Sequence, residues 1–255
     1  MKVGMTLQLT SFNGKPDFQT YQEELALGDM AEDMGFNSIW ALDHHFTGYT
    51  MSPDPTQMLS YFAGRTKRVQ LGTAVIVLPW HDPVEVAENI ALLDVLSNGR
   101  TIIGFGRGAA TVEYAGYRIP MHESRERFVE CAEIVRRGLS QESFSYDGKY
   151  YQIPEIQIRP RPISHPEQRC YASSVSPESA EIMAKLGLGV LIIAQRSWED
   201  TAKDYQRYVE NATASGFQPR PPIGLFNVLV ADDGQDAEDL AQKHLGAMFD
   251  SIENH

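Results

Sequence analysis

The chain has 255 residues, of which 42% are hydrophobic and 22% charged, and its formal net charge is −12 at pH 7. This size suits one sizeable hydrophobic core better than two independent ones, and the composition is that of an ordinary globular protein. The acidic balance argues against nucleic acid as a partner, because phosphate binding requires a basic face.

The compartment follows from the N-terminus and the cysteines. The first ten residues, MKVGMTLQLT, carry one lysine and a strand-like pattern, without the apolar stretch of a signal peptide. No apolar run approaches the ~20 residues that cross a bilayer. The two cysteines, Cys131 and Cys170, do not make a disulfide framework. We therefore expect a cytoplasmic protein that does not contact membranes.

Apolar periodicity divides the chain into alternating strands and helices. Strands are predicted at residues 2–9, 38–42, from 69 onward, 100–105, 169–174, 189–194 and 223–231. Helices are predicted near 21–35, 55–64, 83–96, 124–139, 176–187 and 197–216, and from 236 onward. After Gly108 the pattern is looser, with a turn at Asp147-Gly148 and an extended connector at 159–162.

The segment from Val69 to Gly108 shows the pattern most clearly, as one βαβ unit. Its first strand is almost continuously apolar, which is typical of a strand buried on both faces of a parallel sheet. Asp82 and Pro83 supply a capping carboxylate and a proline in the first helical turn. Asn98-Gly99 ends the helix, and the second strand leads into a glycine-rich segment.

Seven strands that alternate with helices predict a parallel α/β fold. The alternatives are a (β/α)₈ TIM barrel and a doubly wound open sheet, and the lack of a central reversal favours the barrel. An eighth βα unit is not found before His255, so we expect a shortened barrel or a fragment. We expect a single domain over residues 1–255, with a lengthened segment at about 106–165.

In a TIM barrel the chemistry lies at the carboxyl ends of the strands. That edge is predicted to carry three groups of polar residues: Asp43, His44 and His45 after the second strand, Arg107 after the fourth, and residues 174–179 after the fifth. Residues 73–79 run along and just past the third strand to the same edge. We expect these groups to converge.

Asp43, His44 and His45 could form a metal site or could be buried structural residues. Adjacent residues on a strand point to opposite faces, and the sequence offers no evident third ligand. We therefore expect no metal, and we expect the His45 side chain to point away from that of His44.

One glycine motif and one serine motif each have more than one interpretation. Residues 104–109 match G-x-G-x-x-A, but a dinucleotide-binding fingerprint requires a helix at its last small residue. Gly116 and Pro120 argue against a helix there. Ser176 and Ser179 could cap the helix that follows or could bind a phosphate at its N-terminus, and the spacing does not decide between them.

Four stretches together resemble the bacterial-luciferase-like (LLM class) family of flavin-dependent monooxygenases: residues 35–46, 71–79, 83–108 and 173–189. The resemblance implies a TIM barrel with a lengthened segment after the fourth strand. It also implies that reduced FMN and O₂ oxidise a small organic substrate, with a separate reductase supplying the flavin. Such proteins form a homodimer or a heterodimer with a homologous subunit, and the unusually apolar helices at 55–64 and 83–96 suit this face.

The resemblance also implies roles for single residues. Its cofactor-binding positions are Asp43, Thr73, Ala74, Val75, Arg107, Ser174, Ser176 and Ser179. The flavin ring would lie over the third strand, where a non-proline cis peptide joins Ala74 and Val75. Arg107 and Ser179 would hold the phosphate together with the helix dipole. His44 would be the catalytic side chain, because an imidazole exchanges protons near neutral pH.

Asp43 keeps two alternatives open. Many FMN-dependent members carry Glu at this position, and Asp-His also occurs in relatives that use the deazaflavin F420. One alternative is therefore an F420-dependent hydride-transfer oxidoreductase. Another is a non-catalytic flavin-binding protein or subunit. His44-His45 and the helix start at Ser176 favour FMN.

Overall fold

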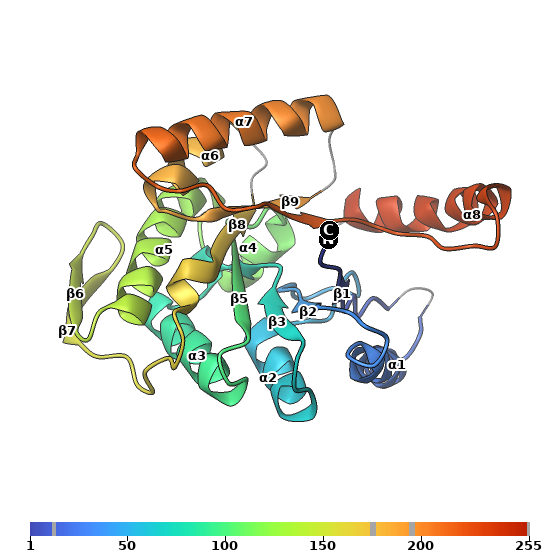
Figure 1. The fold of residues 1–255 in the computed structure, drawn as a ribbon, viewed down its shortest axis with the longest axis horizontal. Helices are drawn as coiled ribbons and strands as arrows, with labels where there is room; N and C mark the ends of the chain where they lie inside the picture. Colours follow the sequence, from blue (N-terminus) through green and yellow to red (C-terminus); the bar gives the residue numbers. More distant parts are fainter. Residues whose placement is uncertain (12–13, 174–176, 194–196, 254–255) are drawn as a thin grey trace.

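The computed structural model describes residues 1–11, 14–173, 177–193 and 197–253. Its centre is a curled sheet of parallel strands in the order β1-β2-β3-β5-β8-β9-β10, with the short strand β4 paired to β5 (Figure 1). The strands are β1 (Gly4–Thr6), β2 (Ser38–Ala41), β3 (Gln70–Thr73), β4 (Ile76–Val77), β5 (Thr101–Gly106), β8 (Cys170–Ser173), β9 (Gly189–Ile193) and β10 (Ile223–Leu225). A separate antiparallel hairpin consists of β6 (Phe144–Asp147) and β7 (Gln152–Ile156).

Helices connect the parallel strands. They are α1 (Asp17–Met30), α2 (Pro55–Arg65), α3 (Pro83–Leu96), α4 (Thr111–Tyr117), α5 (Ser124–Ser140), α6 (Pro177–Lys185), α7 (Trp198–Ala214) and α8 (Gly234–Glu253). Three short 3₁₀ segments are η1 (Leu78–Trp80), η2 (Met121–Glu123) and η3 (Pro166–Arg169). Within the described ranges, no helix combines the length and the apolar character that a bilayer crossing requires.

The order of the strands decides between the two predicted architectures. Each main strand pairs in parallel with its sequence neighbours, so the order never reverses as it does in a doubly wound sheet. The sheet curls as in a TIM barrel, with β1 and β10 at its two ends in the part of the chain that the structure describes. The prediction of an incomplete (β/α)₈ barrel is confirmed.

The starts of α2 and α3 are encoded locally. The Asp54 carboxylate accepts hydrogen bonds from the backbone N–H groups of Thr56 and Gln57, at 2.8 and 2.9 Å. Asp82 caps α3 in the same way, and a proline occupies the first position of both helices. These caps fix where α2 begins after the loop that follows β2, and where α3 begins after η1, which follows β4.

The largest apolar core lies between the sheet and helices α3, α5, α6 and α7. Ile90 of α3, Ile134 of α5 and Phe105 of β5 are fully buried in it. Burial of each such side chain stabilises the fold by roughly 1.5–3 kcal/mol. Cys131 and Cys170 lie in the same core as free thiols.

Two glycines of β5 allow it to lie close to the segment at 73–75. A Cβ on Gly104 would lie 2.3 Å from the Thr73 carbonyl oxygen, and one on Gly106 would lie 2.3 Å from Val75 Cγ2. The peptide bond between Ala74 and Val75 is cis, as the resemblance implied. The glycine-rich motif therefore serves close packing of two barrel strands.

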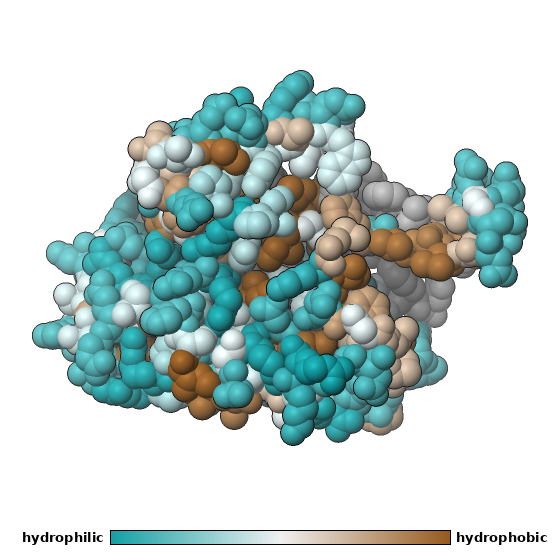
Figure 2. Space-filling model, in the orientation of Figure 1, coloured by the Kyte–Doolittle hydropathy of each residue, from teal (hydrophilic) through white to brown (hydrophobic). Residues whose placement is uncertain are grey.

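The lengthened segment contains a helix that the sequence analysis argued against. Helix α4 forms because Pro120 comes after its end and Gly116 packs against Phe46, leaving 2.3 Å between a Cβ at that position and Phe46 Cε2. The turn at Asp147-Gly148 is confirmed, since it joins β6 and β7. The predicted strand at 223–231 is shorter than expected. Beyond β10 the chain carries an exposed apolar strip that includes Val228 and Val230 (Figure 2).

Candidate active site

His44 follows β2 at the carboxyl edge of the sheet and pairs with a buried carboxylate. Its Nδ1 lies 3.0 Å from Glu113 Oε1, and the Glu113 side chain, from α4, is only 1% exposed. The backbone N–H of His45 donates to the same oxygen at 2.7 Å. Glu113 Oε1 therefore lies between the His44 imidazole and the His45 backbone and orients both.

His45, in the loop after β2, has different side-chain partners from His44. Its Nε2 lies 2.7 Å from Asp43 Oδ1, and Tyr117 Oη lies 3.1 Å from its Nδ1. The second oxygen of Asp43 accepts from Val77 N–H at 2.8 Å and lies 2.8 Å from His81 Nε2. Asp43, His45 and His81 therefore form one network, in which Asp43 and His45 are buried and His81 is partly exposed.

Charges within this network shift the pKa values of its members. Burial alone would raise the pKa of Asp43, but hydrogen bonds from His45, His81 and Val77 N–H outweigh it and lower that pKa. Burial alone would lower the pKa of His81, but the bond and charge of Asp43 raise it. Burial, together with the charges of Asp43 and Glu113, raises the pKa of Tyr117 to about 12. Asp43 is thus held as a carboxylate, and Tyr117 stays protonated near neutral pH.

Aromatic rings enclose the network. The rings of Trp80 and Tyr117 stack at 5.7 Å between centroids, with 13° between their planes. His45 meets Tyr117 edge-on at 4.9 Å, and His44 meets Tyr49 in the same way at 5.0 Å. Aromatic rings therefore pack against both imidazoles.

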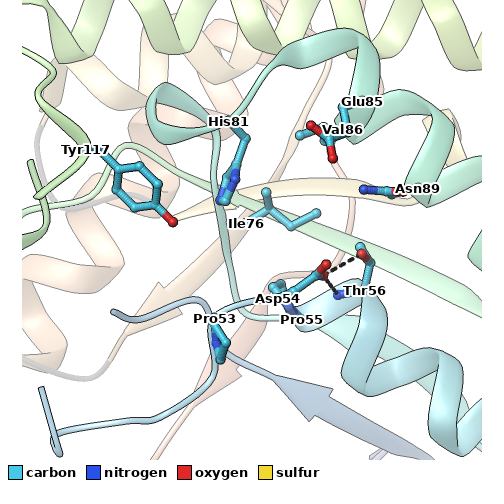
Figure 3. A pocket seen from close by; sticks show the side chains of 10 residues that line it. All are labelled: Pro53, Asp54, Pro55, Thr56, Ile76, His81, Glu85, Val86, Asn89 and Tyr117. Carbon is cyan, nitrogen blue, oxygen red and sulfur yellow. Dashed lines mark hydrogen bonds between the residues drawn. The ribbon is translucent and has the colours of Figure 1, made fainter. Parts of the chain in front are cut away.

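A pocket of about 180 Å³ opens beside His81, between the starts of α2 and α3. Figure 3 shows the imidazole of His81 and the phenol of Tyr117 on one side of it. Asp54 and Glu85 contribute carboxylates from α2 and α3, and Ile76 forms an apolar wall. The pocket gives solvent and small ligands a path to the Asp43 network.

The structure places the remaining predicted residues at the same edge, and they differ in hydrogen bonding and in burial. The Thr73 hydroxyl is used within the sheet, since it donates to Gly104 O at 3.0 Å and accepts from Gly104 N–H at 2.9 Å. Ala74 is buried and Val75 half-buried, between β3 and β4. Thr73 therefore holds two strands together, directly before the residues over which the flavin ring was expected.

The predicted phosphate-binding residues follow two adjacent strands. Arg107 comes directly after β5, half-buried, with Nη1 3.5 Å from Ser124 Oγ. Ser179 is half-buried in the first turn of α6, which follows β8, the neighbour of β5. The predicted contacts of Ser174 and Ser176 lie outside the described residues. A guanidinium and a helix start thus follow neighbouring strand ends.

The comparison with protein families agrees with this architecture. The family model described as luciferase-like monooxygenase matches residues 1–255. The chain belongs to the luciferase-like monooxygenase family. It is 28% identical over 242 residues to the oxygenase component of the flavin-dependent trigonelline monooxygenase of Acinetobacter baylyi, covering 91% of this chain and 67% of that protein.

A second luciferase-like relative is the alkanal monooxygenase alpha chain of Photorhabdus luminescens. The two are 28% identical over 231 residues, which cover 89% of this chain and 64% of the relative. The chain spans about half to two thirds of the length of the curated relatives it matches.

Solved structures show the same luciferase-like fold. Monooxygenase RslO1 from Streptomyces bottropensis matches with a TM-score of 0.93 and 31% identity, covering 100% of this chain and 79% of that one. The oxygenating constituent of a 3,6-diketocamphane monooxygenase from Pseudomonas putida, in complex with FMN, matches with a TM-score of 0.82 at 20% identity. The match covers 95% of this chain and 71% of that one. An F420-dependent secondary alcohol dehydrogenase matches with a TM-score of 0.80 at 20% identity, covering 98% of this chain and 76% of that one. The last two matches support the fold alone.

Sequence reasoning missed two residues of this candidate site. Glu113 is 69 residues from His44 and lies in a segment without clear periodicity, so no local pattern linked them. His81 stands two residues beyond the segment assigned to the third strand end, directly before the cap at Asp82. The available signal was a histidine close to the carboxyl edge of the sheet. His81 joins Asp43 and His45 as the third possible metal ligand, which the sequence analysis did not find.

Proposed function

We propose that this chain is a flavin-dependent monooxygenase that uses reduced FMN and O₂ to oxidise a small organic substrate. The match to RslO1, a monooxygenase at 31% identity over the whole chain, supports this reaction class. The observation that carries the proposal is the pair formed by His44 and the buried Glu113, at the edge of the sheet where Arg107 also lies.

The donors at β5 and β8 fit a phosphate. Arg107 offers a planar guanidinium, and Ser179 adds a hydroxyl in the first turn of α6. Arginine binds phosphate oxygens by charge-assisted hydrogen bonds, and the N-terminal end of a helix attracts anions. We assign Arg107 and Ser179 to the FMN phosphate, with Ala74 and Val75 beneath the ring.

The bound flavin would supply the redox chemistry and the reaction with O₂. The protein's part is to hold and move one proton. Glu113 orients the imidazole of His44, which is 25% exposed and is the group that we assign to accept and return this proton. Since protein donors surround Asp43 on both oxygens, we assign Asp43 the positioning of His45 and His81 in place of a cofactor contact.

Partners follow from the same assignment. The trigonelline enzyme is named as an oxygenase component, which supports a separate reductase that delivers reduced flavin to this chain. The two cysteines of this chain, Cys131 and Cys170, are free and buried, which suits the reducing cytoplasm. Exposed Leu92, Val95 and Leu96 on α3 support a dimer through this helix.

A second candidate is F420-dependent hydride transfer. The His44–Glu113 pair could also take the proton of an alcohol during oxidation, and the fold of an F420-dependent alcohol dehydrogenase matches this one with a TM-score of 0.80. Titration with FMN and with F420, each in oxidised form, distinguishes the two candidates. Preferential binding of F420 would replace the monooxygenase proposal.

Arg107→Ala tests the phosphate assignment. Loss of a charged hydrogen bond should weaken FMN binding by about 1.5–3 kcal/mol and leave riboflavin binding unchanged. Arg207→Ala is the matched control, because this arginine lies on the surface of α7 with its side chain 48% exposed. Equal weakening of FMN and riboflavin would show that Arg107 does not hold the phosphate.

A further inference from the structure

The Asp43 carboxylate is shared by two imidazoles from different parts of the chain. His45 Nε2 and His81 Nε2 lie 2.7 and 2.8 Å from its two oxygens, and one ligand atom from each residue lies within 4.8 Å of the others. Two imidazole nitrogens and one carboxylate are a recurrent donor set for first-row divalent ions. We propose that Asp43, His45 and His81 bind one divalent transition-metal ion.

The geometry requires little rearrangement. Metal–ligand bonds of about 2.0–2.2 Å place neighbouring ligand atoms about 3.0–3.5 Å apart. The two short separations need to widen by less than an ångström, and the wider ones, which reach no more than 4.8 Å, need to shorten. The side chains of Asp43 and His45 are 0% and 5% exposed, and Val77 N–H holds one oxygen of Asp43 in place. The ligands are therefore positioned before the ion arrives.

The surroundings supply the other features of a metal site. Tyr117 Oη lies 3.1 Å from both ring nitrogens of His45 and can accept a hydrogen bond from Nδ1–H when Nε2 binds metal. The 180 Å³ pocket reaches His81, whose side chain is 25% exposed, and provides both an entry path and room for water ligands. Asp54 and Glu85 line the same pocket, and their negative charges attract cations to it.

The ion would act on the active site through the backbone. His45 donates its N–H to Glu113 Oε1, the oxygen that also holds His44. A metal bound to the His45 side chain fixes this peptide and with it the His44–Glu113 pair. The site does not depend on the proposed function, because metal binding requires none of the residues assigned to FMN.

The test is titration of the full chain, without an affinity tag and after removal of metals by a chelator, with Co²⁺ and Zn²⁺. We expect one equivalent of Co²⁺ to bind with a visible d–d absorption band, and Zn²⁺ to displace it. His81→Ala and Asp43→Asn should abolish this band, and Tyr117→Phe should weaken binding about 10–100-fold. His165→Ala is the control, since this histidine is 78% exposed and lies outside the cluster.

Two results would overturn the proposal: no saturable Co²⁺ or Zn²⁺ binding, or binding that His81→Ala leaves unchanged. Either would show that the three residues form a hydrogen-bonded network only. If Asp43→Asn fails to fold by circular dichroism, His81→Gln, at a partly exposed position, decides the question. A chain that binds Co²⁺ but not FMN would support the metal site and refute the flavin assignment alone.

Discussion

Glu113→Gln separates the role of the buried carboxylate from that of His44. The substitution keeps the shape of the side chain and removes its charge. Glu113 Oε1 accepts from His44 Nδ1 at 3.0 Å and from His45 N–H at 2.7 Å. A hydrogen bond to a charged group contributes about 1.5–3 kcal/mol and a neutral one about 0.5–1.5, so each bond should lose about 1–1.5 kcal/mol. Two bonds give an expected loss of roughly 2–3 kcal/mol in the free energy of unfolding.

Only the bond to His44 acts on proton transfer, so the rate should fall by about 5- to 13-fold. The rate is measured by mixing anaerobic protein with bound reduced FMN against O₂ and following flavin reoxidation per bound flavin. Urea unfolding of the same preparation gives the stability. Glu123→Gln is the control, because that carboxylate, at the end of η2, pairs with Arg127 of α5 at 2.8 Å. A variant that is less stable but reoxidises at the wild-type rate would refute the orienting role of Glu113.

Three further predictions concern catalysis, assembly and acid stability. His44→Ala should slow flavin reoxidation by ~10²–10⁴-fold while FMN binding persists, whereas His45→Ala should lower stability or flavin retention; normal turnover per bound flavin in His44→Ala would exclude the proton-transfer role. The chain should be a dimer in light scattering at micromolar concentration, and Leu96→Glu on the exposed face of α3 should dissociate it; a wild-type monomer would contradict the predicted interface. Burial alone would raise the pKa of Glu32, but backbone N–H groups of residues 67–69 donate to it and lower that pKa. Its contribution to stability is therefore present above its unfolded pKa of about 4.3 and is lost as pH falls through the lower folded value. Chemical unfolding should show a larger stability advantage of the wild type over Glu32→Gln at pH 7 than at pH 3, and an equal advantage at both pH values would refute this contribution of Glu32.

Elements with a local cause were predictable from the sequence. The cap at Asp82 and the proline after it define the start of α3, and the structure reproduces that start. Helix α4 was not predictable, because it depends on contact between Gly116 and Phe46, 70 positions apart in the chain.

The same difference applies to the site. His44 and Asp43 directly follow a predicted strand, and barrel topology alone places them at the functional edge. Their partners Glu113 and His81 come from α4 and from the turn before α3, at separations of 69 and 38 residues. No pattern of apolar residues encodes such pairings, since they depend on how loops fold over the end of the sheet.

The order of strands in the sheet also bears on how the chain folds as it is synthesised. Each main strand pairs with the main strand that precedes it in the sequence, from β1 to β10. During translation, every new main strand can therefore pair with a strand that has already left the ribosome. Within these pairings, only the last strand made has no later partner. Vectorial folding of this kind shortens the time during which apolar strand faces stay exposed. We expect nascent chains that end after β5 to protect β1–β3 from proteolysis already.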